Sequence, residues 1–112
     1  MLSLKPIIWL GDSLARLRAL PAEIRSDAGY QLDLIQRGDA PADFRPMPDV
    51  GSGVMEIRLQ GDNEYRVFYT AHFKEAVYVL HCFVKKTERT RKADLDLGKQ
   101  RYSALVERRK SE

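Results

Sequence analysis

Residues 54–86 constrain the fold most, because they hold three strand-like segments joined by very short connections. In order, these segments are VMEIRLQ (54–60), EYRVFYTA (64–71) and AVYVLHCFVKK (76–86). In the first, Met55, Ile57 and Leu59 alternate with polar residues, which is the period of a half-buried strand. Hairpins need only a few connecting residues, whereas parallel strands need a crossover of about a dozen or more. We therefore predict an antiparallel meander.

The third segment is apolar on both faces until its lysines, which is typical of a central strand covered on both sides. Upstream, residues 5–11 are expected to form a first strand and residues 13–20 a short helix. Pro21 suits the first turn of a second helix, over 22–37. Residues 39–53, with three prolines and two glycines, are expected to form a loop.

The last segment, residues 92–110, is expected to be helical. Leu95, Tyr102 and Leu105 form its apolar stripe, and Gly98 is a soft spot that costs about 1 kcal/mol against alanine. The order is then β-α-α-β-β-β-α. We predict one α+β domain over residues 1–112, with a mainly antiparallel sheet, a helical hairpin and a C-terminal helix. The helices are expected on one face of the sheet.

Composition excludes several classes of protein. Hydrophobic residues make up 44% of the chain, enough for a core. The single cysteine, Cys82, cannot form an internal disulfide, and residues 1–10 contain only a four-residue apolar cluster, so a cytoplasmic location is expected. There is no glycine-rich phosphate loop. Cys82 lacks partners at metal-ligand spacing and is expected to be a buried thiol, and His81 a core histidine.

Basic residues are concentrated near the C-terminus. Residues 85–112 hold ten Lys/Arg against five Asp/Glu, whereas the rest of the chain holds nine against eleven. This distribution suggests an anionic partner, with nucleic acid as the first candidate. The alternative is ordinary surface charge on a solvated helix.

One cation stands out within an apolar strand. Burying the Arg66 guanidinium without a partner would be expensive, so it must pair with an acid, Glu56 or Glu64, or face a groove. Antiparallel pairing brings Lys86 and Arg58 to the same end of the sheet as Arg66. Such cations repel one another unless an anion or acids lie between them, and a phosphodiester would be such an anion.

The combination MEIRL, YRVFY, FVKKTERT and ADLDLGKQRY, at this spacing, resembles the core of the RelE/HigB-like toxins of type II toxin–antitoxin systems, in their phage-derived branch. The resemblance implies a microbial-ribonuclease-like sheet. It also implies metal-independent cleavage of mRNA on the ribosome, no cofactor, and inhibition by a helix-turn-helix antitoxin. By position, the resemblance implies a catalytic set of Arg66, Lys86 and Arg58, with an RNA-binding set of Lys85, Arg89, Arg91 and Lys92.

Two matters stay open. Some relatives have a tyrosine or histidine in the C-terminal segment that takes part in the reaction, but residues 91–95 offer neither, so no general base is assigned. The alternatives to an mRNA endoribonuclease are a ParE-like toxin that poisons gyrase and a non-catalytic phage-derived protein that only binds its antitoxin.

Overall fold

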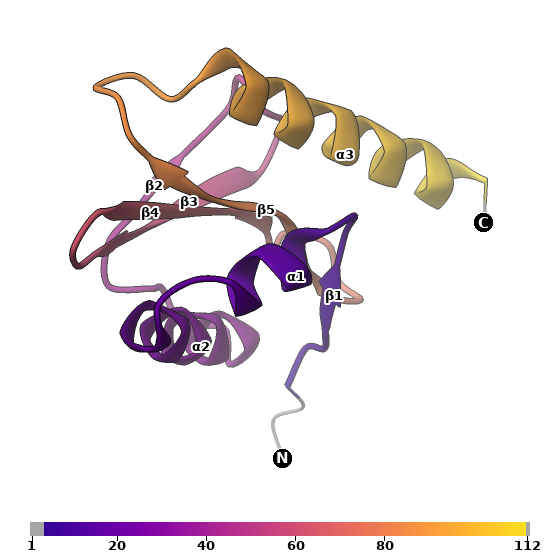
Figure 1. Cartoon of the computed structure of the whole chain (residues 1–112). Helices are drawn as coiled ribbons and strands as arrows, with labels where there is room; N and C mark the ends of the chain where they lie inside the picture. The colour runs from indigo at the N-terminus through magenta and orange to yellow at the C-terminus, as the bar shows by residue number, and fades with distance from the viewer. Residues whose placement is uncertain (1–3, 112) are drawn as a thin grey trace.

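A computed structural model describes residues 4–111 and shows an α+β fold around a five-stranded sheet (Figure 1). The elements are β1 (Ile7–Trp9), α1 (Ser13–Arg18), α2 (Ala22–Gln36), β2 (Phe44–Pro46), β3 (Val54–Gln60), β4 (Glu64–Thr70), β5 (Val77–Lys85) and α3 (Lys92–Lys110). The predicted fold class is confirmed, with the helical hairpin and the C-terminal helix at the expected positions in the sequence.

The sheet has the order β1-β5-β4-β3-β2. The pairs β2–β3, β3–β4 and β4–β5 are antiparallel, as the short connections of the meander predict, and only β1 is parallel to β5. Strand β2 lies within the segment that was expected to be only a loop. Its three residues are all exposed and contain a proline, so they carry no hydrophobic period from which a strand could be predicted.

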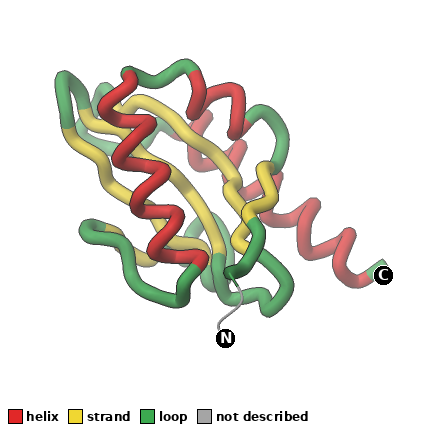
Figure 2. Tube along the Cα trace, turned by 90° about the horizontal axis from the view of Figure 1, so that it is seen from below, coloured by secondary structure: helices red, strands yellow, loops and turns green. Residues whose placement is uncertain are grey.

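Helices cover both faces of the sheet, which corrects the expectation that they share one face. In Figure 1, α1 and α2 lie below the sheet and α3 lies above it. Figure 2 shows α2 lying against the strands and the end of α3 projecting past them. Strand β5 is buried along most of its length, which confirms the prediction of a central strand covered on both sides.

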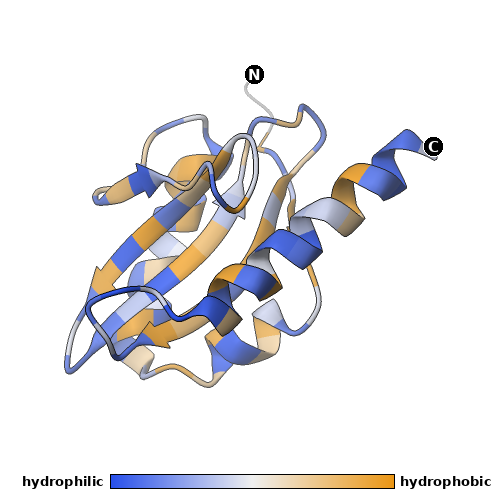
Figure 3. Ribbon diagram, turned by 90° about the horizontal axis from the view of Figure 1, so that it is seen from above, coloured by the Kyte–Doolittle hydropathy of each residue, from blue (hydrophilic) through white to orange (hydrophobic). Residues whose placement is uncertain are grey.

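Two hydrophobic clusters lie on the two faces of the sheet, and the alternation of side chains along a strand assigns each of them to one cluster. Figure 3 shows hydrophobic and hydrophilic residues alternating along the strands. Ile57, Val67 and Cys82 of the strands face α1 and α2. They lie in one cluster with Leu32 of α2. Phe68 faces α3 and packs with Leu105. Glu56, Arg58 and Arg66 have the parity of Phe68 in the paired strands, so they belong to the α3 face.

The glycine of α3 is a packing requirement rather than a soft spot. A Cβ on Gly98 would lie 2.9 Å from Phe68 Cδ2 and 3.1 Å from Val50 Cγ1, so only glycine lets the helix approach the sheet this closely. Among residues 4–111, no helix is both long enough and apolar enough to cross a membrane.

Candidate functional site

The centre of the candidate site is a buried carboxylate, Glu56 of β3. Its Oε1 lies 3.6 Å from Arg58 Nε, 3.6 Å from Arg66 Nε and 3.9 Å from Arg45 Nε. Arg66 also reaches Glu64, with Nη2 3.6 Å from Oε2. We call Glu56 and its three arginines the Glu56 cluster. The expectation that Arg66 pairs with Glu56 or Glu64 is confirmed for both acids.

Strand pairing explains the arrangement. Arg58 lies directly opposite Arg66 across β3 and β4, and Arg45 lies opposite Glu56 across β2 and β3. Directly opposed side chains are close, so two arginines facing each other would repel. Glu56, two residues before Arg58 on the same face, supplies the negative charge that keeps these cations from repelling one another.

The members of the Glu56 cluster differ in solvent exposure. Arg66 and Glu56 are 4% and 3% exposed, whereas the side chains of Arg58 and Arg45 are 32% and 54% exposed. Within residues 4–111, neither Arg58 Nε nor Arg66 Nε has a hydrogen-bond partner. The ion pairs of the cluster are thus long contacts, and donors on two guanidinium groups stay unused.

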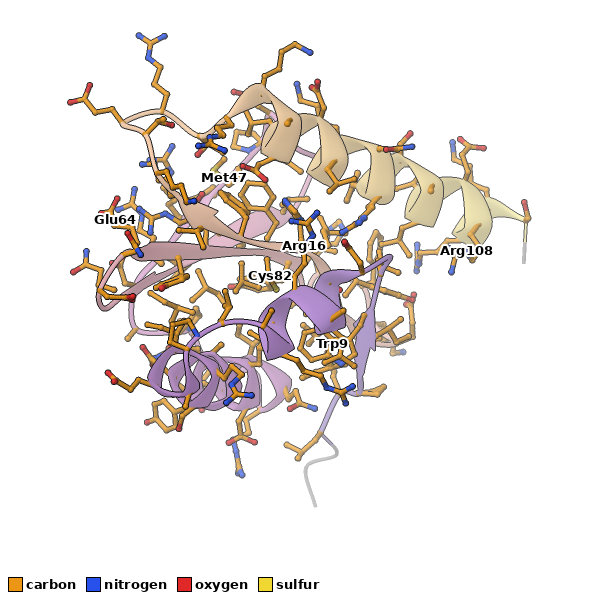
Figure 4. The ribbon with its side chains drawn as sticks, viewed as in Figure 1. Trp9, Arg16, Met47, Glu64, Cys82 and Arg108 are labelled. Carbon is orange, nitrogen blue, oxygen red and sulfur yellow. The ribbon has the colours of Figure 1, made fainter. Side chains whose placement is uncertain are left out.

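The two lysines after the apolar part of β5 lie at the same end of the sheet, as predicted. Lys85 is opposite Glu64, and Lys86 follows it as an exposed residue. Figure 4 shows Glu64 at this end, beside the β3–β4 turn. Both lysines and residues 60–64 line a polar hollow of about 430 Å³. Lys86 therefore opens onto the turn, next to the Glu56 cluster rather than inside it.

A second hollow, of about 400 Å³, lies between β2, β3 and the connector that precedes α3. It is lined by cations, acids and apolar side chains: Arg45, Met47, Asp49, Glu56, Lys85, Glu88, Arg89, Thr90 and Leu95. We call it the Arg45 hollow. Of the predicted RNA-binding residues, Lys85 and Arg89 line it, whereas exposed Arg91 does not, and Lys92 is paired with Asp96 at 2.6 Å.

Sequence reasoning missed Arg45 and treated Glu56 only as a structural partner. Arg45 could not be predicted as a site residue, because residues 39–53 were expected to form a loop. No local pattern in the sequence distinguishes it from other arginines in loops. Glu56 had a usable signal, since its parity places it on the same face as Arg58.

A buried pair joins the sheet to the start of α3. His81 Nε2 lies 2.7 Å from Asp94 Oδ1, and the ring stacks on Phe83 with 5.0 Å between centroids. Burial lowers the pKa of His81, and the neighbouring Asp94 carboxylate opposes that shift. The expected core histidine is confirmed. Asp94, expected in the first turn of a helix, also fixes that turn onto β5.

The remaining candidate groups are occupied or inaccessible. Tyr102 donates its hydroxyl hydrogen to the Ser52 carbonyl at 2.6 Å while its ring packs in the α3-side core. Cys82 is buried as predicted, and burial raises the pKa of its thiol to about 12. Within the described part of the chain, no three His, Cys, Asp or Glu side chains are grouped so that they could hold a metal ion.

Comparison with known proteins identifies a family but no individual curated relative. No curated protein matches the chain. Residues 15–103, from α1 to the middle of α3, match a family described as phage derived protein Gp49-like (DUF891). This match spans most of the sheet and the whole Glu56 cluster. The chain therefore belongs to the family of Gp49-like phage-derived proteins.

Proposed function

We propose that this protein is the toxin of a type II toxin–antitoxin system and acts as a ribosome-dependent mRNA endoribonuclease of the RelE/HigB kind. The Gp49-like family is associated with RelE-like toxins. The observation that carries the proposal is the Glu56 cluster, in which one buried carboxylate lies among three arginines on the α3 face. The proposed partners are the ribosome with its mRNA and a helix-turn-helix antitoxin, with no cofactor.

The proposed reaction uses the Glu56 cluster together with Lys86. The 2′-oxygen attacks phosphorus while its proton passes to the Glu56 carboxylate, the P–O5′ bond breaks, and a 2′,3′-cyclic phosphate forms. The proposed role of Arg58, whose side chain is about a third exposed, is to contact the phosphate and stabilise its developing charge. Arg66 supplies positive charge from behind the carboxylate. Lys86, at the same sheet end, is the proposed proton donor to the leaving 5′-oxygen. Glu56 is buried but contributes to the lining of a surface hollow, and we propose it for the general-base role that the sequence left unassigned.

The test is toxicity and transcript integrity in cells that express single variants. Arg66→Ala, Lys86→Ala and Glu56→Gln should each relieve growth inhibition and stop mRNA cleavage. Arg37→Ala is the matched control, because Arg37 is an exposed arginine paired only within its own helix end, at 2.9 Å from Asp33. Circular dichroism of the purified variants checks folding. Wild-type toxicity of folded Arg66→Ala and Lys86→Ala would rule out this site.

One observation favours a second function, a non-catalytic protein that only binds its antitoxin. Glu56 and Arg66 are almost wholly buried and neutralise each other, as a purely structural pair would. Overexpression without toxicity or transcript cleavage, together with tight co-purification with the product of an adjacent gene, would support this function. Induction of DNA damage with intact mRNA would instead identify a gyrase poison.

A further inference from the structure

We propose that Arg45 is the RNA-binding residue of the Glu56 cluster. It binds a phosphodiester of RNA in the Arg45 hollow, together with Lys85 and Arg89. The inference rests on the proposed function and adds to it a binding residue that lies outside the predicted cation set.

Accessibility selects Arg45 among the arginines of the cluster. All three contact the same oxygen of Glu56, but the Arg45 side chain is 54% exposed, against 32% for Arg58 and 4% for Arg66. Its contact, at 3.9 Å, is also the longest of the three. The side chain of Arg45 makes no hydrogen bond to any of residues 4–111, so its guanidinium can present two parallel N–H donors to a phosphate.

The other two cations that line the hollow, Lys85 and Arg89, are less committed than Arg45. Within residues 4–111, the side chains of Lys85 and Arg89 have no hydrogen bond or ion pair. By contrast, Arg16, Arg37 and Arg109 elsewhere on the surface each pair with a carboxylate within 3.0 Å. Strand β2, the end of β5 and the 86–91 connector thus bring three cations to one hollow, and Arg45 comes from a part of the sequence far from the other two.

The other side chains that line the hollow indicate a nucleotide rather than a bare anion. Met47 and Leu95 provide apolar contact for a base, and Figure 4 shows Met47 on the α3 side of the sheet. Asp49 and Glu88 repel phosphate and so confine it to the cationic part of the hollow. Their carboxylates can also accept hydrogen bonds from base N–H groups. A single-stranded RNA, whose bases are unpaired, offers both kinds of contact.

The experiment measures binding without cleavage. A fluorescein-labelled, single-stranded 2′-O-methyl oligoribonucleotide lacks the attacking hydroxyl, and its affinity is followed by fluorescence anisotropy as salt is increased. The variants are Arg45→Gln and Arg45→Lys. Arg37→Gln is the matched control, because its side chain is 55% exposed, against 54% for Arg45, and the charge change is the same.

We expect Arg45→Gln to weaken binding about tenfold or more, because a charge-assisted pair is lost. The slope of log affinity against log salt should fall by about 0.7, the value for one phosphate contact on a single strand. Arg45→Lys should lie between Arg45→Gln and wild type, and Arg37→Gln should change affinity less than twofold. Equal losses in Arg45→Gln and Arg37→Gln, or wild-type binding by Arg45→Gln, would overturn the assignment. Wild-type binding by Arg45→Lys would overturn the forked contact.

The two proposals can fail separately. If folded Arg66→Ala abolishes mRNA cleavage while Arg45→Gln binds normally, the nuclease stands and Arg45 has no binding role. If Arg45→Gln loses binding while no transcript is cleaved by wild type, the hollow binds RNA and the nuclease proposal fails.

Discussion

Removing the acid of the Glu56 cluster should cost more stability than removing its most buried cation. In Glu56→Met, the charge remains on Arg66, which is 4% exposed in the wild-type structure and faces Arg58 directly across the strands. Its remaining acid, Glu64, lies 3.6 Å away and is 50% exposed, so solvent screens that contact. A charge left buried in this way typically costs about 3–5 kcal/mol.

Arg66→Met leaves a milder defect. Glu56 keeps two cations, with Arg58 at 3.6 Å and Arg45 at 3.9 Å from its Oε1. Methionine also fills much of the volume vacated by the arginine stem. We therefore expect a loss of about 1–3 kcal/mol. The two ranges meet at about 3 kcal/mol, so the test is the order of the two losses, with Glu56→Met the larger.

Urea denaturation, followed by circular dichroism, measures the free energy of unfolding of both single variants and of the double variant. The double variant should be more stable than Glu56→Met alone, because it removes the stranded guanidinium. Strict additivity, or a larger loss in Arg66→Met than in Glu56→Met, would refute the view that Glu56 is the hub of the charge cluster.

Three further outcomes follow from packing and ionisation. Gly98→Ala should lose about 1 kcal/mol in urea denaturation, because overpacking against Phe68 outweighs a helix-propensity gain of about 1 kcal/mol; a stabilised variant would contradict the close approach. Cys82 should resist iodoacetamide at neutral pH until the protein unfolds, since burial raises the pKa of its thiol to about 12, and fast labelling of native protein would count against it. Hydrogen bonds from Arg109 lower the pKa of Glu75 from 4.5 to about 2, so this pair stabilises the fold above pH 4.5 and that contribution is lost as pH falls toward 2. Thermal unfolding of Glu75→Gln should accordingly vary less over that pH range than wild type, and identical profiles would oppose the assignment.

The meander and the last helix could be predicted because their signals are local. Alternation in 54–60 and short connections fix the pairing of β3, β4 and β5, and the helix 92–110 has the predicted bounds. The side on which α3 packs is not a local property. Strand β5 is apolar on both faces, so the sequence shows that both need covering without saying which helix covers which.

Sequence-based predictions for single residues fail where the role of the residue depends on a neighbour that is distant in the sequence. The predicted stability cost of Gly98 rests on helix propensity alone. Helix propensity ignores the Phe68 ring, which occupies the space where a side chain at position 98 would lie. Arg45 lies on a strand with no buried residue, so hydropathy carries no information about it. Its proximity to Glu56 follows only from the pairing of β2 with β3.

This dependence on an edge strand also explains how one cluster can serve both stability and binding. Glu56 must be buried to hold Arg58 and Arg66 side by side, and a buried carboxylate cannot itself attract a polyanion. Arg45 shares that carboxylate from the outside, on β2, where leaving it uncovers no apolar core. A phosphate can therefore draw Arg45 away from Glu56 while the two inner arginines keep the sheet intact. If that division holds, Arg45→Gln should lower RNA affinity with little change in the free energy of unfolding. Glu56→Met should instead lower the free energy of unfolding the most.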